Sequence, residues 1–536
     1  MRRLTFLLLS FCFLLGTAIA QNNRTISGTV KNEQGAPVSN ASVVVKGTTI
    51  GTNTNDKGEF SLSVPSSAKR LVISSLNFES TEVAIGSAPI GVTLVASAGD
   101  LGEVVVSVPY GTIKKTAFTG SAGTVTAATI NKQQVTSVTR VLEGLIPGVH
   151  ATNGGGSPGS DAAIRLRGIG SVNASSAPLY VVNGIPYDGS ISAINSDEIE
   201  SVDVLKDAAA TNLYGSRAAN GVIMITTKRG KKGAAAITGS VRQSFQTRGI
   251  PEYDRVNSGE YYELFWEAYR NSYVYGSGQT FAAAGVNASN VLTGTSGLVY
   301  NAYNVPGNQL VNSTTGKLNP NAQLLWDESW ADALFRNAQR TNASINISGA
   351  TDKMDYFVSG GYLNEEGIAK FSGYQRYNFR TTVNVQATEW LKAGINFDGS
   401  SDKRDGLFAG GTATSNPFYY SRQMGPIYPV YQKNTTTGAN ILDANGQPVL
   451  DFGIPTQMGS RPYAANSNLL GSLALDVRGQ KRFNGNINPY VEVKFLKDFS
   501  FKTTLGLNYF EVDQLTYQNS QYGDAVNVSG RATQTF

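Results

Sequence analysis

The apolar residues of this chain change their spacing near Ile237. From there on, several runs place apolar side chains at every second position, with polar residues between them. The clearest runs are Tyr377 to Val385, Leu391 to Phe397, Leu473 to Val477 and Phe499 to Tyr509. A period of two predicts β-strands that each have one apolar face.

The connections between these runs differ in length. Ala387 to Trp390 and Leu496 to Asp498 are short, whereas Pro251 to Asp332 and Gly399 to Asn466 are long, rich in Gly, Asn and Tyr, and weakly periodic. Strands of roughly ten residues with short turns at one end and long loops at the other are typical of an outer-membrane β-barrel. A soluble antiparallel sheet shows the same period, so the pattern alone leaves both open.

The N-terminal part of the chain, Thr25 to Ile85, predicts another set of short strands. Apolar runs such as Ala41 to Val45 alternate with turn residues such as Asn55 to Gly58. This spacing is typical of an antiparallel β-sandwich. The run resembles the carboxypeptidase-regulatory-like domain. It carries no catalytic residues, which favours a structural or docking role.

Residues 113 to 230 predict a mixed α/β unit. We expect a short helix at Val138 to Leu145, ended by Ile146-Pro147-Gly148, and a helix start capped by Ser196. A second stretch with helix propensity runs from Ala208 to Leu213 and stops at Tyr214-Gly215. The expected strands are Ala163 to Gly168, Leu179 to Val182 with a turn at Asn183-Gly184, Ser201 to Lys206, and Gly221 to Thr227.

A short β-prone segment lies between these two parts. Asp100 to Val108 follows a joint rich in Ser, Ala and Gly, and contains an acidic residue followed by valines. Such a segment can add itself as a strand to the sheet edge of another protein. The alternative is a last strand of the preceding sandwich.

The first twenty residues indicate export. Met1 to Arg3 is basic, Leu4 to Ala20 is apolar, and the run ends in Ala18-Ile19-Ala20. This is the pattern of a secretory signal peptide, with Gln21 as the first mature residue. A transmembrane anchor is disfavoured, because the apolar run falls short of about 20 residues and polar residues follow directly.

Composition narrows the chemistry. The chain has one histidine and one cysteine, Cys12, which lies in the predicted leader. A zinc site needs three or four ligands, so we expect no metal site and no cofactor. Aromatic residues make up 10% of the chain, which argues against disorder. The net charge of +5 indicates no nucleic-acid partner.

Some residue patterns suggest chemistry but have simpler explanations. Gly155 to Gly159 matches G-x-S-x-G near His150, yet no strand-to-helix turn surrounds Ser157, so we expect no catalytic residues. Asp197, Glu198 and Glu200 are explained by capping and solvation of a helix start. Buried ion pairing inside a plug is expected for Arg165, Arg167 and Arg217, and a solvated linker for Lys228 to Lys232.

The order of motifs between residues 113 and 230 resembles the plug of TonB-dependent receptors. Val141 to Val149 resembles "L-x-G-x-x-P-G-V", and Pro178 to Pro186 resembles "P-L-Y-V-I-D-G-V-P", with Asn183 in place of the usual Asp. The densest match, Ile194 to Lys231, looks like the SusC/RagA-type branch. The plug-motif residues carried over are Pro147, Gly148, Pro158, Gly159, Arg165, Arg167, Gly168, Asn183, Gly184, Asp207, Tyr214, Gly215, Arg217, Asn220 and Gly221.

The resemblance implies a transporter in the outer membrane of a Gram-negative bacterium. A SusD-like surface lipoprotein would hand over a bulky nutrient, an oligosaccharide or a peptide, and no enzyme activity is implied. The TonB box, which would pair with periplasmic TonB, would be Glu103, Val104, Val105, Val106, Ser107 and Val108. Pulling on this segment would loosen the plug.

The resulting fold class is mainly β. We expect a signal peptide at 1–20, a carboxypeptidase-regulatory-like β-sandwich at 21–97, and a linker with the TonB box at 98–112. An α/β plug domain at 113–230 and part of a transmembrane antiparallel β-barrel at 231–536 follow. The barrel part predicts only about eight strands, too few to enclose a plug. We therefore expect an N-terminal portion of a longer transporter.

Two further function classes remain open at this point. A receptor that signals on ligand binding would usually carry an extra α/β signalling domain, and residues 25 to 85 predict strands instead. A soluble exported binding protein would differ in leaving the outer-membrane fraction. The substrate cannot be read from the sequence.

Overall fold

The computed structural model describes most of the chain after the predicted leader. The described residues are 23–32, 35–75, 78, 80–86, 89–95, 105–108, 111–114, 122–133, 135–152, 156–166, 168–171, 173, 175–207, 212–249, 252–406, 414–496, 498–523 and 525–536. The predicted signal peptide lies outside them.

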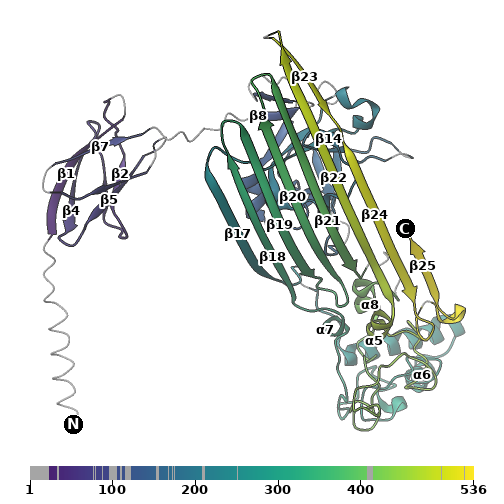
Figure 1. The fold of residues 1–536 in the computed structure, drawn as a ribbon. Coiled ribbons are helices and arrows are strands. Elements are labelled where there is room, and N and C mark those ends of the chain that lie inside the picture. The colour runs from purple at the N-terminus through teal and green to yellow at the C-terminus, as the bar shows by residue number, and fades with distance from the viewer. Residues whose placement is uncertain are drawn as a thin grey trace, which may run out of the picture. The chain divides into compact units, whose positions relative to one another are not determined.

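The N-terminal unit is a β-sandwich of two sheets (Figure 1). One sheet has the order β4-β1-β7 and the other β3-β2-β5-β6. Alternating residues fill the core between them, including Val30, Val43 and Leu71, all fully buried. The strands are β1 (Asn23–Asn32), β2 (Ser42–Val45), β3 (Gly51–Asn53), β4 (Glu59–Pro65), β5 (Arg70–Ser74), β6 (Thr81–Ala84) and β7 (Ile90–Leu94).

The described part of the β-prone segment, Val105–Val108, is not a strand of this sandwich. β8 (Val105–Val108) pairs with β9 (Gly111–Lys114) in a separate two-stranded sheet. The sandwich ends instead with β7, which pairs in parallel with β1.

The plug unit, residues 122–227, contains a five-stranded mixed sheet of order β10-β15-β16-β13-β14. Its strands are β10 (Ala122–Thr126), β13 (Leu179–Val182), β14 (Ile185–Pro186), β15 (Ile199–Leu205) and β16 (Val222–Thr227). β11 (Val149–Thr152) and β12 (Ala163–Leu166) form a separate hairpin pair. The helical pieces are α2 (Ala127–Gln133), α3 (Val138–Val141), η1 (Ile191–Ala193), η2 (Ser196–Glu198) and η3 (Asn212–Ala218).

The turn predicted at Asn183-Gly184 joins β13 to β14. Both residues have positive φ, 50° and 90°, which Asn and Gly adopt most easily. Asn183 has a second role, because its Oδ1 accepts hydrogen bonds from the backbone N–H of Thr227 at 3.1 Å and from its hydroxyl at 3.0 Å. The side chain therefore ties this turn to the end of β16.

The helix start predicted at Ser196 is wrong. The cap of the 3₁₀ turn η2 is Asn195, whose side chain accepts from the N–H of Asp197, and no helix continues beyond Glu198. Ile199 instead begins β15, because Ile199, Val202 and Val204 are fully buried in the plug core. Burial of these β-branched side chains outweighs the local helix signal.

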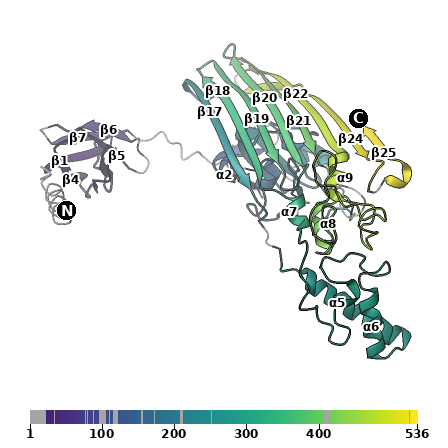
Figure 2. The ribbon, with the colours of Figure 1, turned by 90° about the horizontal axis from the view of Figure 1, so that it is seen from below.

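The largest element is a nine-stranded antiparallel sheet, here called the wall sheet. Its strands are β17 (Gly233–Gln246), β18 (Ala338–Ala350), β19 (Met354–Glu366), β20 (Gly373–Gln386), β21 (Leu391–Asp405), β22 (Val477–Phe495), β23 (Phe499–Thr504), β24 (Leu507–Gln518) and β25 (Arg531–Thr535). β23 and β24 both pair with β22, one after the other along its length. Apart from β22 and β24, neighbouring strands are consecutive in the chain, and the sheet is curved as in a barrel wall (Figures 1 and 2).

The two faces of the wall sheet are opposite in chemistry. The face away from the plug unit exposes apolar side chains at 38 to 79%: Ile237, Val241, Phe245, Ile345, Ile347, Tyr377, Phe379, Ile395, Phe483, Ile487 and Val491. The face toward it buries polar side chains at 9% exposure or less: Ser359, Arg376, Arg380, Thr382, Asn384, Asn396, Ser400, Asp402, Arg482, Asn484, Asn486 and Asn488. A sheet in water buries its apolar face instead. This alternation is therefore the one expected of a sheet whose outer face lies in an apolar environment.

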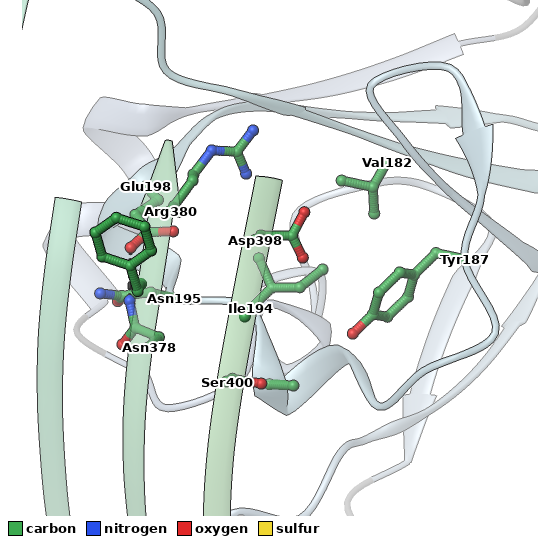
Figure 3. A pocket seen from close by; sticks show the side chains of 12 residues that line it. Val182, Tyr187, Ile194, Asn195, Glu198, Asn378, Arg380, Asp398 and Ser400 are labelled. Carbon is green, nitrogen blue, oxygen red and sulfur yellow. Dashed lines mark hydrogen bonds between the residues drawn. The ribbon is translucent and has the colours of Figure 1, made fainter. Parts of the chain in front are cut away.

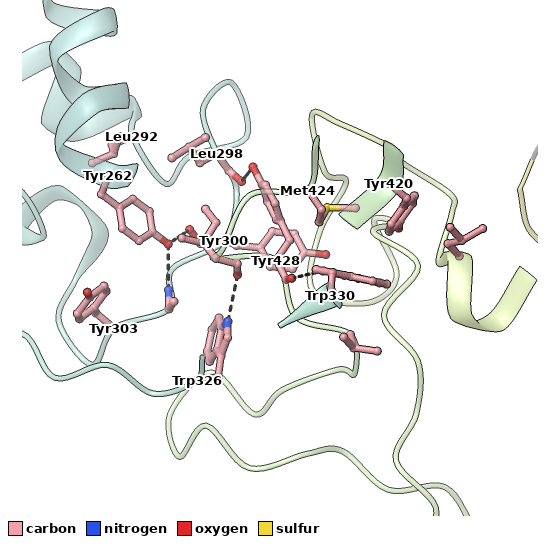
Figure 4. Packing of buried hydrophobic residues seen from close by; sticks show 14 of the residues in the cluster. Tyr262, Leu292, Leu298, Tyr300, Tyr303, Trp326, Trp330, Tyr420, Met424 and Tyr428 are labelled. Carbon is pink, nitrogen blue, oxygen red and sulfur yellow. Dashed lines mark hydrogen bonds between the residues drawn. The ribbon is translucent and has the colours of Figure 1, made fainter. Parts of the chain in front are cut away.

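Both long connections of the wall sheet leave the same end and fold together. They form the loop module, residues 252–337 and 414–476, with helices α5 (Ser258–Asn271), α6 (Phe281–Val291), α7 (Trp330–Leu334), α8 (Pro417–Gln423) and α9 (Leu469–Leu475). The π-turn η4 (Ser272–Gly276) extends α5, and η5 (Gly307–Gln309) and η6 (Val526–Val528) are short 3₁₀ turns. One buried cluster combines Tyr262 and Trp330 of the first connection with Tyr420 and Tyr428 of the second (Figure 4).

Two expectations for this region are wrong. Leu473 and Leu475 lie in α9, not in a strand, and β22 begins only at Val477. Gly399 does not begin a loop, because β21 continues to Asp405. The short apolar run had no feature that separates a helix from a strand, and Asn468 supplies a helix cap by accepting from the N–H of Gly471.

Candidate functional site: the interface of plug and wall

Residues 190–198 of the plug unit lie against the polar face of the wall sheet. The Arg376 guanidinium donates to the carbonyl oxygen of Ser192 at 2.5 Å and to that of Ile194 at 3.3 Å. Arg482 donates from Nη1 to the Ser190 hydroxyl at 2.7 Å and from Nη2 to that of Ser192 at 3.2 Å. Two wall strands, β20 and β22, thus hold one short segment of the plug through its backbone and hydroxyl oxygens.

The acidic end of the same segment is held by side chains. Asp197 accepts from Nη1 of Arg242 at 2.9 Å and from the amide of Asn342 at 3.2 Å. Glu198 Oε1 accepts from the Ser359 hydroxyl at 2.8 Å and from the Asn378 amide at 2.6 Å. Both carboxylates therefore point from the plug into the wall.

This placement corrects the expectation that Asp197 and Glu198 are solvated. The Glu198 residue is only 6% exposed, while Glu200, two residues on, keeps 45% of its side chain exposed and lies 3.7 Å from Nζ of Lys231. Only Glu200 behaves as the expected surface acid. The sequence placed all three acids on one solvated helix start, and the η2 turn instead directs two of them toward the wall.

Burial raises the pKa of the Glu198 carboxyl above its ordinary value, and the positive charge of Arg380 opposes this shift. Desolvation disfavours the charged carboxylate. No ion pair of Glu198 occurs among the described residues within the 4 Å that defines one. Glu198 is therefore a buried acid held by neutral donors.

A small cavity lies beside Glu198, and Figure 3 shows it between the plug and strands β20 and β21. Its volume is about 20 Å³, enough for one water molecule. Arg380 and Asp398 of the wall line it together with Glu198 and Tyr187 of the plug. Asp398 also accepts from the amide of Asn486 at 2.7 Å.

Three further contacts join plug and wall. The Thr136 hydroxyl donates to the carboxylate of Glu365, Arg404 donates to the carbonyl oxygen of Gly159, and Arg380 donates to the Thr227 hydroxyl. Gly159 has φ +66°, and a Cβ there would overlap the ring of Tyr374. Glycine is thus required at this position by both the backbone and the wall.

Most plug-motif residues organise the plug itself. The Pro147 carbonyl oxygen accepts from Lys206 at 2.8 Å, and the Asn220 amide donates to the carbonyl oxygen of Ser175 at 2.8 Å. Positive φ is found at Gly148, Gly159, Gly168, Asn183, Gly184, Gly215 and Gly221. Pro158 is buried beside Gly159, whereas Asp207 and Tyr214 lie on the chain between β15 and β16. Arg167 lies outside the described residues.

The arginines predicted to form buried ion pairs do not do so where they are described. Arg217 pairs with Asp188 at 2.6 Å, but the two side chains are 55% and 70% exposed. Arg165 lies on the exposed side of β12, opposite His150 of β11. The buried arginines at the interface come from the wall sheet, and no sequence motif marks them.

The remaining candidate residues, Ser157, Lys228 and Lys232, have structural contacts. Ser157 is not at a strand-to-helix turn, and its carbonyl oxygen accepts from Arg140 at 3.2 Å and from Ser160 at 2.6 Å. Lys228 is no free linker residue, because its Nζ donates to the Asp197 carbonyl oxygen at 2.7 Å. Lys232 is solvated and pairs with Asp352 at 2.7 Å.

The TonB-box prediction is described only in part. Val105, Val106, Ser107 and Val108 form β8, whereas Glu103 and Val104 lie outside the described residues. Within the described part of the chain, no group of three or more His, Cys, Asp or Glu could hold a metal ion. None of the helices described there has the length and hydropathy needed to cross a membrane.

Residues 114–222 match the TonB-dependent Receptor Plug Domain family, and residues 26–106 match the CarboxypepD_reg-like domain family. The chain is 31% identical over 549 residues to TonB-dependent receptor SusC of Bacteroides thetaiotaomicron, covering 98% of this chain and 48% of SusC. Residues 114–222 thus carry the plug of TonB-dependent receptors, and the chain as a whole is similar to the SusC/RagA-type branch. TonB-dependent receptor P39 of Formosa agariphila is 30% identical over 99% of the chain and 45% of its own length.

Solved structures have the same fold. The RagAB peptide importer in the 'open-open' state matches with a TM-score of 0.57 at 24% identity, over 77% of this chain and 43% of that chain. The same importer in the 'closed-closed' state matches with a TM-score of 0.56, over 76% of this chain and 42% of that chain. The predicted fold class is confirmed. The chain spans less than half the length of the curated relatives it matches.

Proposed function

We propose that this chain belongs to a transporter that imports a bulky nutrient across the outer membrane, driven by TonB. The observation that carries the proposal is the opposite chemistry of the two faces of the wall sheet. An exposed apolar face suits lipid, and a buried polar face suits a plug that must move past it. The similarity to SusC and to RagAB supports the same reading.

The TonB box of this transporter is the segment Glu103 to Val108. Its valines favour an extended backbone, and among the described strands β8 pairs only with the short strand β9. A two-stranded hairpin is marginally stable by itself, so β8 can exchange β9 for a strand of TonB by edge addition. Force on this segment then reaches the plug through the chain that leads into β10.

The outer-membrane partners follow from the family. A SusD-like lipoprotein at the cell surface captures the nutrient and delivers it to the receptor, in keeping with the similarity to SusC. The nutrient is an oligosaccharide or a peptide. The loop module lies at the end of the wall sheet that carries the long connections, which is the extracellular end in outer-membrane barrels.

The TonB role is tested by proline substitution in the source bacterium. Val106→Pro removes a backbone donor and disfavours strand pairing, while Val106→Thr keeps a β-branched side chain and serves as the matched control. We expect Val106→Pro, and deletion of Glu103 to Val108, to abolish uptake while surface binding of the nutrient persists. Unchanged uptake in the deletion strain would contradict the role.

The alternatives predict different outcomes. A soluble exported binding protein would leave the membrane when cells are fractionated without detergent, whereas the transporter stays in the outer membrane. A signalling receptor would change gene expression on ligand addition without accumulating the nutrient. Radiolabelled uptake measured beside membrane fractionation separates the three.

A further inference from the structure

The cavity beside Glu198 has the features of a built water site. It is about 20 Å³ in volume, and Arg380, which lines it, is 2% exposed with an Nε that has no hydrogen-bond partner among the described residues. A buried donor left unpaired costs about 1–3 kcal/mol, and one water in the cavity can satisfy it.

We propose that this cavity binds one water molecule between Glu198, Arg380 and Asp398, and that Glu198 is the positioning residue that holds the plug on the wall until the TonB box is pulled. We call Glu198, Ser359, Asn378, Arg380 and Asp398, with this water, the catch. The second half of the inference rests on the proposed function.

The contacts explain why Glu198 in particular holds the plug. Its Oε1 receives two donors from two neighbouring wall strands, Ser359 of β19 and Asn378 of β20. Its backbone oxygen accepts from the N–H of Lys228 at 2.8 Å, which ties it to the end of β16. Glu198 therefore joins the central sheet of the plug to the wall through one residue.

The arrangement also explains how the catch opens. Glu198 makes no direct ion pair with Arg380 among the described residues, so the water stands between the buried charges. When the plug shifts, the bridging water joins bulk water and the three polar groups are hydrated instead of left unpaired. Hydration lowers the cost of breaking the catch once force has started to move the plug.

Two substitutions at Glu198 separate the acceptor from the charge. Glu198→Gln keeps an oxygen for Ser359 and Asn378, whereas Glu198→Ala leaves both donors buried without an acceptor. We expect Glu198→Ala to raise the passive entry of a bulky antibiotic about tenfold in cells whose TonB is de-energised, because one lost buried acceptor corresponds to at least that factor. Glu198→Gln should not raise entry.

The matched control is Glu200, two residues away, exposed and paired with Lys231. Glu200→Ala should not change antibiotic entry, and the amount of folded receptor in the outer membrane is measured for every variant. If Glu198→Ala and Glu200→Ala admit the antibiotic equally at equal receptor levels, Glu198 is not the holding residue. If deletion of Glu103 to Val108 leaves uptake unchanged, the proposed function is rejected. The comparison of Glu198→Ala with Glu200→Ala remains valid in that case.

The water is tested directly by a high-resolution crystal structure of the whole receptor. We expect one density peak in the cavity within hydrogen-bond distance of Arg380 Nε. This measurement needs only the natural protein, so it can be made even if the Glu198→Ala variant fails to accumulate. A dry cavity, or a direct contact between the Glu198 carboxylate and the Arg380 guanidinium, would overturn the site.

Discussion

The loop module offers a sharp test of how two distant parts of the chain are joined. Tyr300, in the first long connection, donates its hydroxyl to Asp451, in the second, at 2.8 Å from Oδ2 and 3.0 Å from Oδ1. Asp451 and its partner Arg461, 3.6 Å away, have fully buried side chains. Burial raises the pKa of the Asp451 carboxyl, while Arg461 and the Tyr300 hydroxyl oppose the shift. Tyr300→Phe removes one of these two opposing groups.

The magnitude follows from the type of bond. A hydrogen bond to a charged group contributes about 1.5–3 kcal/mol, so the substitution should lower the free energy of local unfolding by that amount. Local opening should then become about 10 to 100 times more frequent. Hydrogen exchange of the amides near Tyr300 and Asp451, measured in the whole receptor, reports this opening directly.

Tyr303→Phe is the matched control. Tyr303 belongs to the same buried cluster, and no hydrogen bond of its hydroxyl is found among the described residues. Exchange in Tyr303→Phe should stay within a small factor of the natural protein. Equal exchange rates in Tyr300→Phe and the natural protein would refute the view that this bond links the two connections.

Three further predictions follow from the structure. Ile345→Arg, on the exposed apolar face at 54% exposure, should reduce the free energy of unfolding in lipid by about 2–4 kcal/mol; an unaltered denaturation midpoint would show that this face does not meet lipid. Leu71→Ala, in the fully buried sandwich core, should cost about 2–5 kcal/mol, measured by urea unfolding, and a loss under 1 kcal/mol would mean a loosely packed core. Because the pKa of Glu198 is raised when the plug is seated, seating should strengthen as pH falls from the raised pKa toward the ordinary 4.5. The groups that face Glu198 are Asp197 and Tyr187 of the plug and Arg376, Arg380 and Asp398 of the wall. Passive antibiotic entry, measured against pH, should fall on acidification in the natural protein but not in Glu198→Gln. Parallel pH profiles of the two proteins would reject this role of Glu198.

The period-two pattern predicted the wall strands well because the two faces of each strand differ in chemistry. β20 and β21 lie where Tyr377 to Val385 and Leu391 to Phe397 alternate. The plug strands β13 and β16 were equally clear, since turn residues bound them. A local sequence pattern is enough to predict a strand where its residues alternate regularly between the same two environments.

The interface could not be predicted in the same way. Arg376 and Arg380 occupy polar positions of β20 that read as solvent-facing, and only the plug beside them makes them buried. The burial of Glu198 on the plug side could not be predicted either, because an acid in a first turn has a local explanation as a capping residue. The one available signal was their alternation with outward apolar residues, which places Arg376 and Arg380 on the inner face.

The most direct test of this architecture is the environment of the two faces of β20. The natural chain has no cysteine after Cys12, so a single spin label can be placed at Phe379, on the apolar face, with Tyr253, 96% exposed in the loop module, as the aqueous control. In the whole receptor in lipid bilayers, the label at Phe379 should collide with dissolved oxygen and be shielded from a water-soluble nickel complex, while the label at Tyr253 should show the reverse. Equal access of the nickel complex to both positions would contradict a lipid-facing wall that encloses the plug.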